Sequence, residues 1–245
     1  MTAALETRNL TKHFGASVAV DDVSFSIEPG VTTGLLGGNG AGKTTTIAML
    51  LGLIAPTSGA IRILGLDPAQ HGSEARAKMN FQSPYVDMPK RLSVRRNLAI
   101  YAKLYGVKRP IEAVESAAEE LQLTALLTRK TGSLSAGQAT RVGIAKALIN
   151  NPSVLLLDEP TASLDPDTAD WVRGVLEAYQ ARSGAAILLA SHNMGEVERL
   201  AGRVLMMKSG RIVDDGAPKT LIAKYGRDNL EEVFLQIARR EEGVA

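Results

Sequence analysis

Residues 134–138 read LSAGQ, and residues 154–160 read VLLLDEP. Upstream of both, residues 37–44 read GGNGAGKT and directly follow the apolar or β-branched residues 31–36. Glycines let a backbone approach a polyphosphate closely and turn its N–H groups inward, and the start of the next helix favours an anion. In such a loop Lys43 would reach the β- and γ-phosphates, and the Thr44 hydroxyl would bind Mg²⁺. The glycine-rich stretch alone predicts a nucleoside triphosphate site.

The apolar run at residues 154–157 predicts a buried strand that delivers two carboxylates to its carboxyl end. Asp158 would face the phosphates as a magnesium partner, and Glu159 would polarise the attacking water. Taken alone, Glu159 is equally well explained as a surface acid at the end of a strand. The presence of the glycine-rich stretch in the same chain favours a catalytic role for Glu159.

Alternating strand and helix signals predict an α/β fold with a mostly parallel sheet. We expect strands at residues 23–27, 31–36, 61–64, 154–157 and 187–190, and a hairpin at residues 204–213. Helices are expected at residues 44–53, 94–105, 111–121 and 139–149, with Asp165 and Pro166 at the start of another.

These elements predict a single domain, in which a helical segment is inserted into the middle of an α/β core. Residues 1–84 and 153–218 would form an α/β nucleotide-binding core, and residues 85–152 a helical subdomain that carries LSAGQ. Residues 219–245 would form a C-terminal helical tail with a frayed end.

The composition excludes several function classes. The chain has 245 residues and a net charge of +2, which does not suggest a nucleic-acid binder held by charge. It has no cysteine, so it has neither a disulfide framework nor a cysteine-based metal site. No stretch approaches the ~20 apolar residues that span a bilayer, so a membrane role would need another chain. The N-terminus lacks the layout of a signal peptide.

The order of the three motifs resembles the ATP-binding subunits of ABC transporters, over residues 5–218. Residues 52–59, 64–68 and 229–234 most resemble subunits of ABC-2-type exporters. The resemblance implies a P-loop NTPase fold with a RecA-like core sheet, an N-terminal antiparallel β portion and an inserted helical subdomain. It implies an ATPase that uses ATP and Mg²⁺ and closes as a homodimer, or as paired ATPase subunits, with ATP at the interface.

The resemblance also implies an ABC-2-type transmembrane permease subunit as partner, no nucleic acid, and a place at the cytoplasmic face of the cell membrane. Closure of the dimer would reach the permease through residues 85–97. The alternative is a soluble ABC ATPase of an assembly system with no membrane partner. A P-loop kinase or GTPase would leave LSAGQ unexplained.

The resemblance assigns each site residue a role by position. Glu159, His192 and Gln82 would be catalytic, and Thr44, Gln82 and Asp158 would hold the metal. Ser135 and Gly137 would contact the γ-phosphate bound to the other subunit, and Asp165 would act across the same interface. The expected nucleotide contacts are Phe14, Gly37, Gly38, Asn39, Gly40, Ala41, Gly42, Lys43, Thr44, Thr45, Ser135, Gly137, Gln138 and Asp165.

Some positions depart from the family pattern or keep a simpler explanation. Gly38 stands where proline is usual, Ala136 where glycine is usual, and Phe14 where tyrosine is commoner. A phenyl ring can still stack on adenine, although Phe14 could instead be a core residue. Gln82 lacks the usual preceding proline and could be an ordinary polar loop residue. Asp165 would serve equally well as a helix N-cap.

Overall fold

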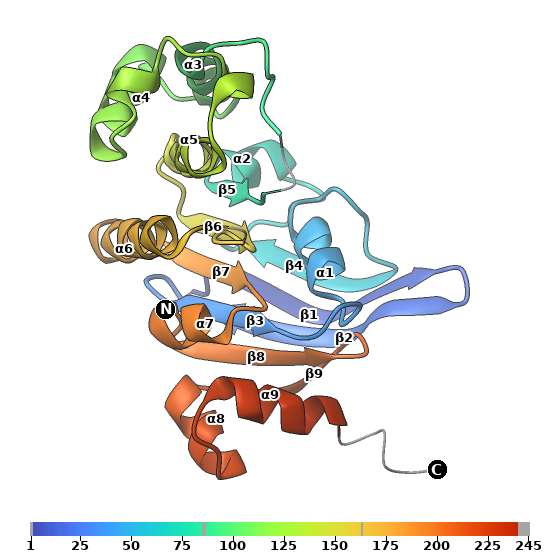
Figure 1. The fold of residues 1–245 in the computed structure, drawn as a ribbon. Helices are drawn as coiled ribbons and strands as arrows, with labels where there is room; N and C mark the ends of the chain where they lie inside the picture. The colour runs from blue at the N-terminus through green and yellow to red at the C-terminus, as the bar shows by residue number, and fades with distance from the viewer. Residues whose placement is uncertain (1, 85–86, 163, 240–245) are drawn as a thin grey trace.

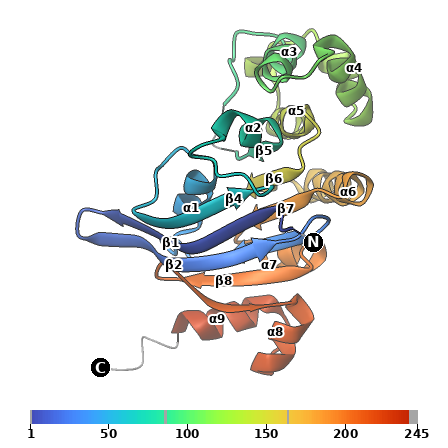
Figure 2. The same ribbon diagram turned by 180° about the vertical axis from the view of Figure 1, so that it is seen from behind.

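The computed structural model describes residues 2–84, 87–162 and 164–239 and contains two β-sheets (Figure 1). Strands β1 (Leu5–Phe14), β2 (Ser17–Ile27) and β4 (Ser58–Ile63) form an antiparallel sheet in the order β2-β1-β4. Figure 2 shows this sheet in front of helix α1. It is the antiparallel β portion that the sequence predicted.

The larger sheet has the order β5-β6-β7-β3-β8-β9. It consists of β3 (Thr32–Leu36), β5 (Met79–Gln82), β6 (Val154–Asp158), β7 (Ala186–Ala190), β8 (Arg203–Lys208) and β9 (Arg211–Gly216). All neighbours pair in parallel except β8 and β9, which form the predicted hairpin. Asp158 and Leu35 both pair with Ala190, so β6, β7 and β3 end side by side. The predicted fold class is confirmed, and this edge is where ligands of such sheets bind.

The parallel strands are buried on both faces, because alternate side chains enter two different cores. Leu155 and Leu157 of β6 pack in a cluster that includes the central helices, whereas Val154 and Leu156 pack in a cluster with α1 and the antiparallel sheet. The run of apolar residues before Asp158 therefore serves both cores at once and fixes the position of the carboxylates that follow it.

Nine α-helices are described. They are α1 (Lys43–Leu50), α2 (Gly72–Ala77), α3 (Val94–Leu104), α4 (Pro110–Glu120), α5 (Ala136–Leu148), α6 (Pro166–Ser183), α7 (Met194–Leu200), α8 (Pro218–Tyr225) and α9 (Leu230–Arg239). Two short 3-10 turns, Thr124–Leu126 and Thr131–Ser133, precede α5. Helices α3, α4 and α5 lie together above the sheets in Figure 1.

One helical prediction needs correction. The first helix ends at Leu50 and not at Leu53, because the chain turns at Gly52 with φ 71°. The predicted helical tail consists of two helices, because Gly226 ends α8 in the left-handed conformation with φ 60°. Residues 240–245, the expected frayed end, lie outside the described residues.

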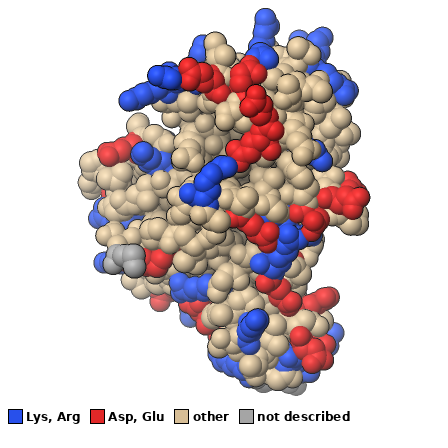
Figure 3. All heavy atoms as spheres, turned by 90° about the vertical axis from the view of Figure 1, so that its left-hand side faces the viewer, with Lys and Arg blue, Asp and Glu red and all other residues tan. Residues whose placement is uncertain are grey.

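Acidic and basic side chains are intermixed over the face shown in Figure 3. Within residues 2–84, 87–162 and 164–239, no helix has both the length and the apolar character needed to cross a bilayer.

Candidate active site

The phosphate loop (residues 37–44) leaves β3 and turns into α1 over two glycines that tolerate no side chain. Gly42 has φ 105°, and a Cβ there would lie 2.6 Å from the carbonyl oxygen of Ala19 in β2. A Cβ on Gly37 would collide with the backbone of Met207 at the end of β8. The phosphate loop therefore packs closely against β2 and β8. Gly38, Asn39 and Gly40 are exposed, Ala41 is buried, and Thr44 and Thr45 follow Lys43 in the first turn of α1.

Lys43 folds its side chain back over the phosphate loop. Its ammonium group donates to the carbonyl oxygens of Gly37, at 2.5 Å, and Gly38, at 3.2 Å. Burial lowers the pKa of Lys43, and the negative charges of Glu159 and Asp158 oppose that shift. The amine thus lies within electrostatic reach of both carboxylates at the end of β6.

The two carboxylates differ in surroundings. Asp158 is only 7% exposed, and burial, together with the neighbouring Glu159, raises the pKa of Asp158. Glu159 leaves the extended conformation with φ 52°, and its side chain meets the segment after β7. His192 donates its backbone N–H to Glu159 Oε1 at 3.0 Å, and its Nδ1 lies 2.7 Å from Glu159 Oε2. The imidazole of His192 is 71% exposed.

A hollow of about 650 Å³ joins these groups. It is lined by Glu159 and His192, by Gly37, Gly38 and Asn39 of the phosphate loop, and by Glu231, Phe234 and Leu235 of α9. The backbone of the phosphate loop, a carboxylate and an imidazole around one hollow suit the binding of a polyphosphate and the activation of a water beside it.

The donors near the phosphate loop fit a magnesium ion held jointly by protein and phosphate. Mg²⁺ usually takes one or two protein oxygens and completes its shell with phosphate oxygens and water. Thr44 supplies a hydroxyl at the start of α1, and Asp158 a desolvated carboxylate that a cation would stabilise. In the described part of the chain, no group of three or more His, Cys, Asp or Glu side chains could hold a metal without the nucleotide.

The signature segment (residues 134–138) starts α5 and lies on the surface. Ser135 is the N-cap: its Oγ accepts from the Gln138 N–H at 3.3 Å, and Gln138 Oε1 accepts from the Ser135 N–H at 3.1 Å. A Cβ on Gly137 would lie 3.3 Å from the Thr168 hydroxyl in α6. Ser135 is therefore a helix N-cap, as the simpler explanation of this segment holds. The segment also contacts α6 through Gly137.

The structure does not direct Gln82 toward Asp158. Gln82 pairs with Leu157 across β5 and β6, so both side chains lie on the same face of the sheet, toward α5. The Gln82 amide lies against Gly143 of α5, donates to the Ser83 carbonyl at 3.3 Å, and lines a separate hollow of about 280 Å³ with Ala136. Its metal-binding role stays a prediction.

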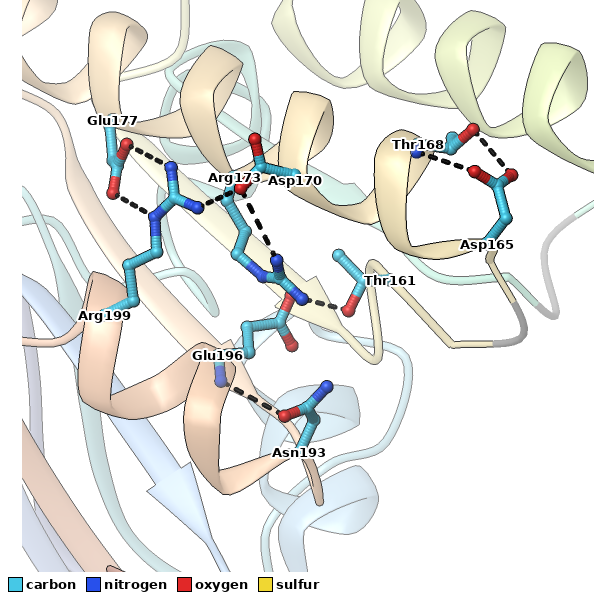
Figure 4. A network of polar contacts seen from close by, with 9 residues as sticks. All are labelled: Thr161, Asp165, Thr168, Asp170, Arg173, Glu177, Asn193, Glu196 and Arg199. Carbon is cyan, nitrogen blue, oxygen red and sulfur yellow. Dashed lines mark hydrogen bonds and ion pairs between the residues drawn. The ribbon is translucent and has the colours of Figure 1, made fainter. Parts of the chain in front are cut away.

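The structure tests the simpler explanations given for Phe14, a core residue, and for Asp165, a helix N-cap. Phe14 is 51% exposed at the end of β1, so it is not a core residue, and its ring faces the Lys12 ammonium at 5.1 Å. Asp165 is the N-cap of α6 and accepts from the Thr168 N–H at 2.9 Å and from its hydroxyl at 2.8 Å (Figure 4). These hydrogen bonds lower the pKa of Asp165.

Comparisons with known proteins agree with this geometry. A family profile described as ABC transporter matches residues 20–162. The chain belongs to the ABC transporter family. A Nod factor export ATP-binding protein I from Paraburkholderia xenovorans is 37% identical over 234 residues, which cover 95% of this chain and 77% of the relative.

Solved structures of ABC transporter ATP-binding subunits share the fold. One such subunit superposes with a TM-score of 0.88 and 27% identity, covering 97% of this chain and all of that chain. An ATP-binding cassette solved as a dimer in a post-hydrolysis state with ADP and Pi has a TM-score of 0.77 and 24% identity, over 87% of this chain and 98% of that chain. The protein is therefore an ATP-binding, ATP-hydrolysing subunit that powers an ABC transporter.

The sequence did not point to several residues around the site. Thr161, Ser191 and Glu196 form a buried polar cluster beside Glu159, and Phe234 of α9 packs near Gly38, with 3.8 Å between its Cζ and a Cβ placed there. Glu196 stands three residues after the helix cap Asn193, which suggests an exposed side chain of the first turn. Its carboxylate is instead buried against Thr161 and Ser191, in the segments that follow β6 and β7.

Proposed function

We propose that this ABC transporter subunit hydrolyses ATP with Glu159 as the base that polarises the attacking water. The observation that carries the proposal is the contact between Glu159 and His192 at the mouth of the hollow that the phosphate loop lines. A carboxylate held there is free to accept a proton from water, while the exposed His192 side chain can contact the terminal phosphate.

The phosphate loop and Lys43 would bind the polyphosphate, and Phe14 would stack on the base. Thr44 and Asp158 would hold Mg²⁺, which neutralises charge on the phosphates when it is bound. Lys43 lies within electrostatic reach of both carboxylates, so it would also offset their repulsion of the γ-phosphate. Gln82 would join this set only after its side chain leaves α5.

Two copies of the chain, or paired ATPase subunits, would complete the site. Ser135, Gly137 and Gln138 would meet the γ-phosphate bound to the opposite copy, and Asp165 would act across the same interface. The exposure of the signature segment supports this arrangement, as does the dimeric cassette of the same fold. Binding of ATP would favour the closed dimer, and hydrolysis would release it.

The transporter would be an ABC-2-type exporter, with this chain bound to a transmembrane permease at the cytoplasmic face of the membrane. The relative named for Nod factor export supports export as the direction of transport. We further propose that residues 85–152 act as a helical subdomain that transmits closure, with contacts through residues 85–97. Of these, Tyr85 and Val86 lie outside the described residues.

Glu159→Gln tests the catalytic assignment. Because glutamine keeps the shape of the side chain but is a poor base, we expect kcat to fall about 10²- to 10⁴-fold while ATP binding persists. Turnover and fluorescent-nucleotide binding are measured on the purified full chain, and size exclusion should show an ATP-dependent dimer. Glu119→Gln, the same change at an exposed glutamate of α4, is the matched control. Turnover of Glu159→Gln near the wild-type rate would remove Glu159 from the role of base.

A pull-down tests the permease proposal. Tagged Glu159→Gln is recovered with Mg·ATP from detergent-solubilised native membranes, and co-purifying chains are identified by mass spectrometry. A stoichiometric partner with several apolar spans of about 20 residues is expected. Recovery of partners without such spans would instead favour the assembly-type ATPase and leave the ATP chemistry intact.

A further inference from the structure

One buried carboxylate beside the site has no role in the chemistry described so far. Glu196 lies in the first turn of α7 and is 1% exposed. Burial raises the pKa of Glu196, and hydrogen bonds to two hydroxyls and the positive charge of Arg173 in α6 partly offset that effect. A carboxylate is costly to bury unless it is hydrogen-bonded, so its partners indicate what it does.

The two hydroxyls that donate to the Glu196 carboxylate lie on the segments that carry the proposed hydrolytic residues. The Thr161 hydroxyl donates to Glu196 Oε1 at 2.8 Å, and Thr161 follows Glu159 by two residues along the chain (Figure 4). The Ser191 hydroxyl donates to Glu196 Oε2 at 2.8 Å, and Ser191 immediately precedes His192. Glu196 therefore ties the loop after β6 to the loop after β7.

Ser191 sits between two carboxylates and has a single proton to give. Its Oγ lies 2.8 Å from Glu196 Oε2 but 3.4 Å from Glu159 Oε2. The hydroxyl therefore donates its hydrogen bond to Glu196, at the shorter distance. The Asn193 N–H donates to Ser191 Oγ at 3.1 Å and fixes the hydroxyl from the other side. While the Ser191 hydroxyl donates its hydrogen bond to Glu196, the lone pairs of Glu159 Oε2 remain available to His192 and to water.

The helix that carries Glu196 is itself anchored. The Asn193 side chain accepts from the Glu196 N–H at 3.1 Å and caps α7. Arg199, one turn later, donates to both carboxylate oxygens of Glu177 in α6, at 2.9 and 3.1 Å, and also contacts Asp170 (Figure 4). Glu196 is thus presented from a helix fixed against α6, which lets it hold the two loops in one register.

We propose that Glu196 is a positioning residue for ATP hydrolysis, which orients Glu159 and His192 by holding the Ser191 and Thr161 hydroxyls. This inference rests on the proposed roles of Glu159 and His192. Without the Glu196 carboxylate, Ser191 would turn its proton to Glu159 Oε2, which would weaken that oxygen as a base. Thr161 would lose its anchor in the same step.

Steady-state ATPase assays of the full chain test the proposal with Glu196→Gln. A small displacement of a catalytic group is costly, so we expect kcat to fall about 10- to 100-fold, with KM for ATP changed by less than about threefold. Glu119→Gln, the same change at an exposed glutamate of α4, is the control, and it should keep kcat within about twofold of the wild type. The melting temperature of each variant is recorded to separate turnover from folding.

Ser191→Ala supplies a second, independent variant that removes little volume. It should lower kcat without raising KM, and the double variant Ser191→Ala/Glu196→Gln should be no slower than the worse single variant, because both changes break one linkage. If Glu196→Gln does not fold, Ser191→Ala alone must show the kcat loss. A kcat near wild type, a change confined to KM, or two losses that multiply would each overturn the proposal.

Glu159→Gln, assayed in parallel, separates the two hypotheses. If Glu159→Gln remains active, the proposed hydrolytic site is wrong and the positioning role falls with it. If Glu159→Gln is inactive while Glu196→Gln behaves as the wild type, only the positioning role is wrong.

Discussion

The phosphate loop and the signature segment belong to one predicted site, yet they differ in their packing and in the charged groups around them. The phosphate loop is packed against β2 and β8, and its lysine lies within electrostatic reach of two carboxylates. The signature segment is exposed, and its serine and glutamine bond only to each other in the contacts described. One region gathers the groups of the proposed reaction centre, whereas the other is an exposed helix start.

This difference is what a site divided between two copies requires. A helix N-terminus attracts anions, but the start of α5 faces α6 and the hollow beside Gln82, not the hollow beside Glu159. Its partner phosphate would therefore have to come from another copy. Substitutions on either side of this division test it.

Lys43→Ala should disable the phosphate loop most severely. Removal of a preorganised cation beside a reacting phosphate costs roughly 10²- to 10³-fold in rate, and loss of ATP binding adds to it. Turnover and nucleotide affinity are measured together, with Lys103→Ala, an exposed lysine of α3, as the control. Retention of ATP affinity in Lys43→Ala would show that the reaction centre lies elsewhere.

A mixture of two inactive variants should recover activity if the site is divided. Ser135→Arg blocks the signature segment, and Lys43→Ala blocks the phosphate loop. A mixed dimer pairs the intact loop of one chain with the intact signature segment of the other, so turnover should rise severalfold above the sum of the separate preparations. Activity that equals that sum would place both motifs in the same chain's site.

Lys146 joins the helix that carries the signature segment to the larger sheet, because it lies in α5 and donates to the Phe81 carbonyl in β5 at 2.7 Å. Burial lowers the pKa of Lys146 to about 8. Between pH 8 and about 10.4, the usual lysine pKa, the unfolded chain binds the proton more tightly than the folded chain, so stability should rise with pH over that range.

The matched variant for this pH effect is Lys146→Met, which cannot titrate. Relative to Lys146→Met, the wild type should gain about 2–3 kcal/mol of unfolding free energy between pH 7 and pH 10. Urea unfolding at several pH values provides the measurement. A difference that stays constant with pH would mean that Lys146 is not desolvated at the junction.

Two glycines of the phosphate loop should respond in opposite directions, with the smallest effect at Gly38. A Cβ on Gly38 meets only the Phe234 ring, at 3.8 Å, and Gly38 is outside the left-handed region, so Gly38→Ala should stabilise the fold by about 0.4–1 kcal/mol. Gly42→Ala should destabilise it by more than that, because of its φ of 105° and the Ala19 carbonyl. Thermal unfolding measures both, and equal shifts would contradict the packing described for the loop.

Much of the fold and of the candidate site could be predicted from local patterns. The apolar run before Asp158 predicted β6, because a strand buried on both faces needs apolar residues at every position. Asp165 and Pro166 predicted the start of α6 because capping depends on neighbours in the sequence. The side-chain direction of Gln82 could not be predicted, since it follows from the pairing of Gln82 with Leu157 in another strand.

By itself, the sequence determined the chemistry of this protein: a phosphate loop with its lysine, two carboxylates at a strand end, and a helix start able to bind an anion. Each depends on residues adjacent in the chain, whose backbone conformation and donors are set locally. The burial of Glu196 beside Glu159 and the position of Phe234 of α9 near Gly38 depend instead on tertiary packing. Those contacts join segments far apart in the chain, and they exist because close packing of two sheets and their helices leaves one arrangement for each side chain.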